Sequence, residues 1–179
     1  APGADPQFAP EFSKTDIFDA LDYMVADQSN PLTPEMIKDI LDWVEKKGDD
    51  SPLMKGKLLE LLFKHPGMSR EMIENALKKE QDPEIYRSIL LNPNAPEDFL
   101  KKIYFGNLVI PFDGDEVAAV LASPNVPVGL LDVEASQYAA VEPSDTLGRY
   151  RGGDNRRARR AREVLLSPNV TEEIFNKVA

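Results

Sequence analysis

Cysteine is absent from this chain, and histidine occurs once in 179 residues. The lack of a thiol excludes disulfides, cysteine-ligated zinc, iron–sulfur clusters and thiol nucleophiles. Long apolar runs are also missing, since none approaches the ~20 residues that a membrane-spanning helix needs. No signal-peptide pattern opens the chain, and a start at Ala1 is what removal of a methionine or processing of a precursor would leave. We therefore expect no membrane-spanning segment.

Residues suited to catalysis or metal binding are sparse. His65 precedes Pro66 at an expected helix end, where a polar side chain can bond the last carbonyls of the helix. Acids surround Gly114 in FDGDEV, residues 112–117, which is too short for a calcium loop and typical of a helix start. Capping is favoured over catalysis or cation binding at both places. We predict no enzyme activity, no catalytic or metal-binding residue and no cofactor, and only a hydrolase built from carboxylates stays open.

Charge is distributed unevenly along the chain. The whole chain carries −10, but residues 149–162 hold seven arginines and a single acid, Asp154, for a local charge of +6. The remainder therefore carries −16. Such an acidic remainder repels polyanions, which argues against generic nucleic-acid binding by the whole surface.

The arginine-rich segment is the most informative charged feature. In RRARRAREVLL, Ala158, Ala161 and Leu165 are expected to face inward, with Val164 or Leu166 completing the apolar stripe. The arginines would then cover the outer face of a helix. Guanidinium groups bind carboxylates or phosphates in forked geometry. The alternatives are an acidic protein partner, including a second copy of the chain, the protein's own acidic surface, and, less favoured, nucleic acid. The predicted partner-binding arginines are Arg149, Arg151, Arg156, Arg157, Arg159, Arg160 and Arg162.

The N-terminal segment, residues 1–12, is expected to be an extended arm. Prolines at positions 2, 6 and 10 disfavour a helix and favour polyproline-like conformations. Phe8 and Phe12 can anchor such an arm in a groove of a partner protein, and packing on the chain's own domain is equally open. We predict a single helical domain over residues 13–179, with a loop insertion at about 139–155.

Capping signals divide that domain into about nine or ten short helices. Ser13 and Asp16 have the spacing of a capping box, and Thr33 precedes a proline at an expected helix start. No convincing strand pattern occurs, so the predicted fold class is all-α. The later helices are expected at residues 96–105, 115–122, 127–138, 156–166 and 171–178.

A short motif recurs between these helices. The copies are HPGMSREMI, NPNAPEDFL, SPNVPVGLL and SPNVTEEIF, with a looser fifth copy in NPLTPEMIK. The first proline of each copy stops the preceding helix, the Pro-Asn pair suits a turn, and the next helix starts two residues later. The recurrence predicts stacked helix–corner–helix units.

The segments LASPNVPVGLL and LLNPNAPEDFL resemble the leucine-rich repeat variant family. The resemblance implies a right-handed superhelix of short helices, and such repeats also occur in phage-encoded proteins. The iron–sulfur cluster known beside some of these repeats cannot form here without cysteine. Because the motif prolines stand 27, 31 and 44 residues apart, we expect an irregular, solenoid-like stack.

These features favour a protein–protein interaction or assembly function, such as a virion structural or accessory component. Docking would use the N-terminal arm and the arginine-rich segment, and the protein would be intracellular or associated with a virion. Two alternatives stay open. One is a nucleic-acid-associated protein that binds phosphates through residues 149–162, and the other is an acidic decoy or inhibitor of a basic partner.

Overall fold

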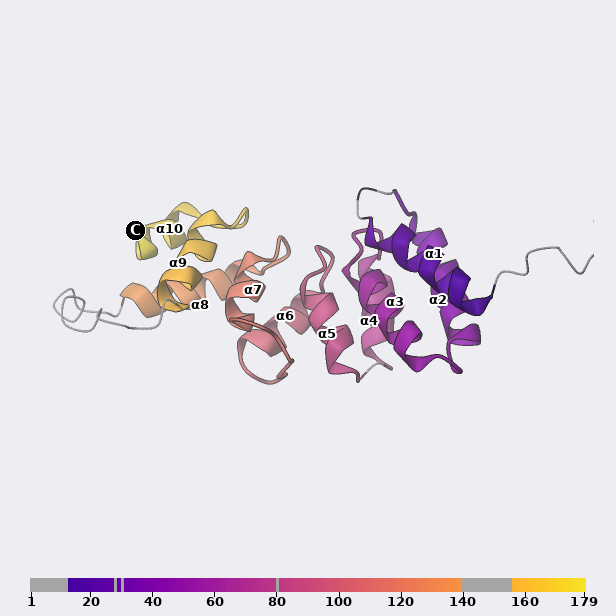
Figure 1. Cartoon of the computed structure of the whole chain (residues 1–179). Helices are drawn as coiled ribbons and strands as arrows, with labels where there is room; N and C mark the ends of the chain where they lie inside the picture. Colours follow the sequence, from indigo (N-terminus) through magenta and orange to yellow (C-terminus); the bar gives the residue numbers. More distant parts are fainter. Residues whose placement is uncertain (1–12, 28, 30, 80, 140–155) are drawn as a thin grey trace, which may run out of the picture. The chain divides into compact units, whose positions relative to one another are not determined.

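The computed structural model describes residues 13–27, 29, 31–79, 81–139 and 156–179 (Figure 1). The described residues form ten α-helices and no strand, which confirms the predicted all-α class. The arm at 1–12 and nearly all of the insertion at 139–155 lie outside these residues. The helices are α1 Lys14–Ala26, α2 Pro34–Lys47, α3 Pro52–Lys64, α4 Arg70–Leu77, α5 Pro83–Leu90, α6 Glu97–Tyr104, α7 Glu116–Ala122, α8 Val128–Ala139, α9 Arg156–Leu166 and α10 Glu172–Val178.

The chain divides into two compact units, Ala1–Met68 and Ser69–Ala179, and each is described by itself. The single domain expected over residues 13–179 stays a prediction. The first unit holds α1, α2 and α3, and the second holds α4 to α10. In the first unit α1 packs on α3, and the rings of Phe18 and Trp43 meet edge to face with centroids 5.0 Å apart.

The predicted capping residues begin the helices as expected. Ser13 and Asp16 form a reciprocal capping box at the start of α1. Thr33 accepts a hydrogen bond from the N–H of Met36 at the start of α2, and Ser69 does the same for Met72 at α4. The later helices begin and end within one residue of the predicted positions. Local sequence therefore determines where these helices start.

The four closer copies of the recurring motif form the same corner. The residue before the proline accepts a hydrogen bond, through its side chain, from the N–H two residues further on. This acceptor is His65 Nδ1 at 2.9 Å, Asn92 Oδ1 at 2.8 Å, and Ser123 Oγ and Ser167 Oγ at 3.3 Å. The backbone carbonyl of each also accepts from the N–H three residues on, at 3.0–3.2 Å. Three kinds of side chain, histidine, asparagine and serine, thus serve one turn because each offers an acceptor.

His65 differs from its predicted role in one respect. Its imidazole was expected to bond the last carbonyls of the ending helix, but Nδ1 accepts from the N–H of Gly67 instead. The carbonyl of Leu62 in the last turn receives the backbone N–H of His65. The imidazole therefore stabilises the turn of the corner and does not cap the carbonyls at the end of the helix.

In the second unit, asparagine side chains join successive corners. The Nδ2 group of Asn125 donates to the carbonyl oxygens of Pro93 and Ala95 in the preceding corner. One corner later, Asn169 Nδ2 donates to the carbonyls of Pro124 at 3.0 Å and Val126 at 3.1 Å. The same donor thus reaches the same two acceptors in each case, and we call this series of contacts the asparagine ladder. It links corners that are 31 and 44 residues apart in sequence.

The corner at Gly67 has no asparagine and comes close to another backbone instead. A Cβ atom at Gly67 would lie 2.5 Å from the carbonyl oxygen of Leu32 and 2.8 Å from Cδ1 of Ile37. Leu32 belongs to the looser fifth copy of the motif. Any side chain at position 67 would therefore push these two corners of the first unit apart.

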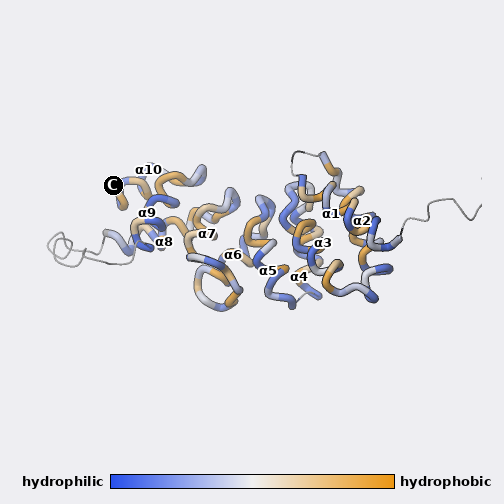
Figure 2. Tube along the Cα trace, viewed as in Figure 1, coloured by the Kyte–Doolittle hydropathy of each residue, from blue (hydrophilic) through white to orange (hydrophobic). Residues whose placement is uncertain are grey.

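The helices of the second unit pack through the apolar sides that their spacing predicts. In Figure 2, hydrophobic and hydrophilic positions alternate along these helices. α10 packs on α8, α9 packs on α7, and α6 also contacts α7. Fully buried side chains from these helices form the core of the unit: Leu100, Val120, Leu121, Leu131, Val164 and Ile174. An ion pair of 2.6 Å between Lys177 and Asp132 adds a polar link between α10 and α8.

The asparagine ladder predicts that two substitutions of Asn125 lower the free energy of unfolding by different amounts. We expect Asn125→Ala to lower the free energy of unfolding by about 1–3 kcal/mol, because two carbonyls lose their donor. Asn125→Asp should lower it further, since a carboxylate would face those carbonyls. Urea denaturation followed by circular dichroism measures both, with exposed Asn75→Ala in α4 as the control. Equal stability of the Asp variant and the parent would contradict a donor role for Asn125.

Candidate interaction site on the arginine-rich helix

Five of the seven arginines in the predicted partner-binding segment lie on α9. These are Arg156, Arg157, Arg159, Arg160 and Arg162. The other predicted contacts, Arg149, Arg151, Phe8 and Phe12, lie outside the described residues.

The inward side of α9 differs from the predicted one. Ala161 and Leu165 are half-buried and Val164 is fully buried, but Ala158 is exposed. Arg160 lies one turn before Val164 and takes the inward place instead, with 27% of its side chain exposed. A long guanidinium side chain fits there because an acid of another helix receives it.

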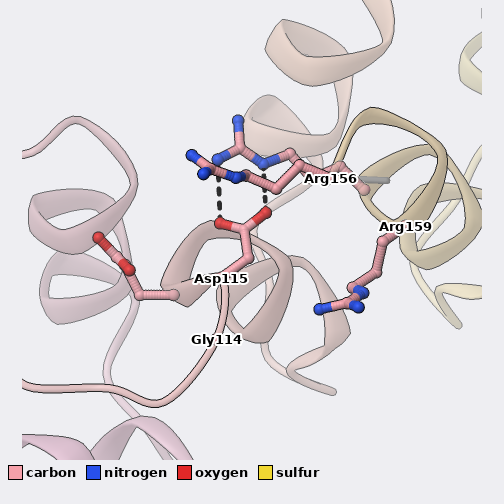
Figure 3. A pocket seen from close by; sticks show the side chains of 6 residues that line it. Gly114, Asp115, Arg156 and Arg159 are labelled. Carbon is pink, nitrogen blue, oxygen red and sulfur yellow. Dashed lines mark hydrogen bonds and ion pairs between the residues drawn. The ribbon is translucent and has the colours of Figure 1, made fainter. Parts of the chain in front are cut away.

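That acid is Asp115, the N-cap of α7. Arg160 Nε donates to Oδ2 of Asp115 at 2.6 Å and Nη2 donates to Oδ1 at 2.9 Å, which gives a forked pair (Figure 3). Asp115 Oδ1 also accepts from the N–H of Val117, which confirms for Asp115 the capping role predicted for the acids of residues 112–117. Only 5% of the Asp115 side chain is exposed. One carboxylate therefore caps α7 and holds α9 on it.

The pKa values of this pair follow from two opposing effects. Burial acts to raise the pKa of Asp115, but hydrogen bonds and charge from Arg160, together with backbone N–H groups, outweigh burial and lower it. The hydrogen bond that Arg160 donates to Asp115 raises the pKa of Arg160, against the desolvation that would lower it. Both groups are therefore charged at neutral pH, and the pair is a true ion pair.

A second polar cluster, which sequence reasoning missed, surrounds Glu134. This carboxylate is only 2% exposed and accepts hydrogen bonds from the hydroxyls of Tyr104 at 2.6 Å and Tyr138 at 2.8 Å. Burial and then the hydrogen bonds to Glu134 raise the pKa of both tyrosines. The positive charge of Arg160 acts in the opposite direction on the pKa of both tyrosines, but its effect is smaller. The cluster thus joins α6 and α8 next to the ion pair.

Arg157 also makes contacts within the unit. Its guanidinium carbon lies 5.3 Å from the centre of the Tyr138 ring, and Nη2 donates to the carbonyl of Gln137 at 3.2 Å. The hydroxyl oxygen of Tyr138, which donates to Glu134, also lies 3.2 Å from the backbone carbonyl oxygen of Arg157, so its proton is shared between the two acceptors. Arg157 and Arg160 therefore attach α9 to its own unit.

Two of the remaining arginines, Arg156 and Arg159, border an open cavity of about 370 Å³. Arg156, Arg159 and Arg160 line it from α9, and Gly114, Asp115 and Glu116 line it from the start of α7. Figure 3 shows the Arg159 side chain lying apart from the Asp115–Arg160 pair. Since Arg160 already neutralises Asp115, the two other arginines exceed the charge of Glu116, and the lining carries a net positive charge. Such a cavity accommodates a small anionic group.

The described residues contain no group of three or more acidic or histidine side chains placed to hold a metal ion. Within the same residues, no helix has the length and apolar character needed to cross a membrane. Comparison with protein-family models, curated proteins and solved structures finds no match to this chain.

Two neighbouring arginines are expected to respond differently to the same substitution. Arg160→Gln removes the partner of a nearly buried carboxylate and should lower the free energy of unfolding by about 2–3 kcal/mol. Arg159→Gln, at an exposed position one residue earlier, should change it by about 0.5 kcal/mol or less. Chemical denaturation of both variants tests this expectation. Equal losses would show that α9 is not held through Arg160.

The tyrosine cluster predicts a loss of stability in alkali. A tyrosine with a raised pKa contributes stability that is complete below the unfolded pKa of ~10 and is lost as the pH rises above that value. We expect the parent to lose more stability between pH 9 and pH 11 than the double variant Tyr104→Phe with Tyr138→Phe. Urea denaturation across this range measures the difference, with exposed Tyr23→Phe as the control. Identical pH profiles of parent and double variant would rule out the contribution of the cluster.

Proposed function

We propose that the chain is a non-enzymatic protein-interaction module whose helix α9 binds an acidic partner protein. The observation that carries this proposal is the cavity lined by Arg156 and Arg159 beside an ion pair that is already satisfied. The described residues provide no ion pair to Arg159 or Arg162. A partner's carboxylate in the cavity would supply the negative charge that Arg159 lacks.

The composition of the cavity favours a carboxylate over a larger anion. Glu116 lines the same cavity and opposes a second dense negative charge at short range. A single aspartate or glutamate side chain carries one charge and matches the fork of one guanidinium group. The proposed recognition is therefore insertion of one acidic side chain of a partner between Arg159 and Arg156.

A nucleic acid is the less favoured occupant of this helix. Phosphate backbones bring a line of charges rather than one, and the chain outside residues 149–162 carries −16. Away from α9, that acidic surface repels a polyanion.

The proposed architecture is an irregular, right-handed, solenoid-like stack related to the leucine-rich repeat variant proteins. The asparagine ladder and the common corner geometry support repeated stacking of similar units. Such stacks are typical of binding proteins, because they present long surfaces. The version of this function that we favour is a virion or other assembly component, which would dock through the arm at 1–12 as well as through α9.

The proposal predicts that charge reversal on α9 abolishes binding of an acidic peptide. The probe is the shortest oligoglutamate, a blocked diglutamate peptide that brings two charges rather than a line of them, titrated into the full chain by calorimetry at low salt. We expect the double variant Arg156→Glu with Arg159→Glu to bind about tenfold more weakly or worse, since each charge-assisted hydrogen bond is worth about 1.5–3 kcal/mol.

The matched control is Lys101→Glu with Lys102→Glu on exposed positions of α6, which changes the net charge of the chain equally. It should keep the parent affinity for oligoglutamate. Equal weakening by both pairs would show a general charge effect and would refute a site on α9. Tighter binding of a 20-base-pair DNA duplex than of oligoglutamate, lost in the α9 variant, would favour the nucleic-acid alternative.

A further inference from the structure

The outer side of α1 presents an exposed aromatic ring beside an exposed carboxylate. Tyr23 is 83% exposed, more than any other aromatic residue among those that the structure describes. Asp19 is also exposed and stands four residues earlier, so the two side chains are neighbours on the same side of the helix. Phe18 and Val25, each 1% exposed, pack α1 against its own unit. The ring and the carboxylate are therefore presented on a fixed backbone.

The charged residues of this part of the chain are all acids. Residues 15–37 contain five acids and no basic residue. Asp22 pairs with Lys57 at 3.1 Å, and Asp16 caps α1, so those two carboxylates are already used. Asp19 has no ion pair among the described residues. A charged surface does not need to be covered for the unit to fold, so a complementary charge is what would bring a second molecule to it.

The second unit already contains one contact between α9 and such a pair of side chains. On α8, Glu134 and Tyr138 have the same four-residue spacing, and the hydroxyl of Tyr138 donates to Glu134 at 2.8 Å. The guanidinium carbon of Arg157 on α9 lies 5.3 Å from the centre of the Tyr138 ring. A carboxylate and a tyrosine four residues apart are thus what α9 contacts within its own unit. Asp19 and Tyr23 present the same combination at the surface of α1.

Two arginines on another side of α9 can make the same contact with a second molecule. Arg159 and Arg162 are exposed, and the described residues give neither an ion pair. They stand three residues apart, which makes them neighbours on the helix surface. A guanidinium binds a carboxylate through forked hydrogen bonds and lies over an aromatic ring through a cation–π contact. This pair of arginines therefore matches a carboxylate and a ring that are one helical turn apart.

We infer that the acidic partner of α9 is α1 of a second copy of this chain. Asp19 of one copy enters the cavity and pairs with Arg159, and the Tyr23 ring lies against the guanidinium of Arg162. The inference rests on the function proposed above and names the partner that binds there. Charge complementarity selects a second copy, because the same chain carries an arginine-rich helix and, in its other unit, a segment whose charged residues are all acids.

The association is head to tail, because α9 and α1 are different surfaces. Each copy keeps either a free α1 or a free α9 after the first contact, so further copies add at both ends. Such heterologous contacts make closed rings or open filaments. This outcome fits the assembly role proposed for the chain and needs no partner of another kind.

Sedimentation equilibrium of the full chain at low salt tests the inference. We expect the average mass of the parent to rise with protein concentration and to fall back as salt screens the contact. Arg159→Glu with Arg162→Glu should weaken the association by about tenfold or more, and Asp19→Lys with Tyr23→Lys, the α1 variant, should do the same. All four positions are exposed, and thermal unfolding first establishes that both variants fold.

Mixing the two variants identifies the pairing. In an equal mixture the new glutamates of one variant meet the new lysines of the other, so association should return. The matched control, Asp42→Lys with Asn75→Lys at exposed positions of α2 and α4, changes the net charge as much as the α1 variant does and should associate like the parent. A mixture that stays monomeric, or an α1 variant that associates like the parent, would overturn the inference.

Binding of diglutamate separates this inference from the function on which it rests. The α1 variant should bind diglutamate as the parent does, because its α9 is intact. A parent that stays monomeric up to millimolar concentration but binds diglutamate would overturn the second copy as the partner and leave the proposed carboxylate site standing. Absence of both diglutamate binding and self-association would refute the site itself and the inference with it.

Discussion

The second unit depends on one repeated interaction, the donation of an asparagine amide to two carbonyls of the preceding corner. A corner made by proline leaves backbone carbonyls without helical partners, and burying them unpaired would cost free energy. Asn125 and Asn169 each donate to two carbonyls, so one side chain supplies the hydrogen-bond donor for both carbonyls of a corner. The apolar helices can then pack closely although the copies of the motif are unequally spaced in the sequence. The 44-residue spacing before the last copy does not interrupt this contact.

The arginine-rich helix combines structural and exposed side chains on one short element. Arg160 and Arg157 attach α9 to its own unit through Asp115 and Tyr138. Arg159 borders the cavity and Arg162 is exposed. Arg157 and Arg160 fix the backbone of α9, which would reduce the entropy lost on binding the partner that we propose for Arg159.

The candidate site was only partly predictable from the sequence. The seven arginines of residues 149–162 identified the segment without knowledge of its contacts, but all of them were predicted to bind a partner. Asp115 precedes Arg160 by 45 residues, and no local spacing connects the two. Glu134 was not foreseen either, since an acid beside apolar helix residues reads as an exposed position until Tyr104 and Tyr138 are placed against it. Charge pairing and burial are properties of the packed unit.

Sequence alone determined the all-α class, the start of each helix and the recurrence of the corner, because proline, asparagine, serine and threonine act on the backbone within four residues of themselves. The choice of which side of α9 faces inward was decided only by tertiary structure. Spacing favoured Ala158 on that side, yet Arg160 lies there, because the nearly buried carboxylate of Asp115 stabilises a guanidinium more than the core would gain from one methyl group. The exposure of Phe175 is likewise a tertiary property. Its sequence position matches those of Leu100 and Leu131, and only the packing of neighbouring helices distinguishes them.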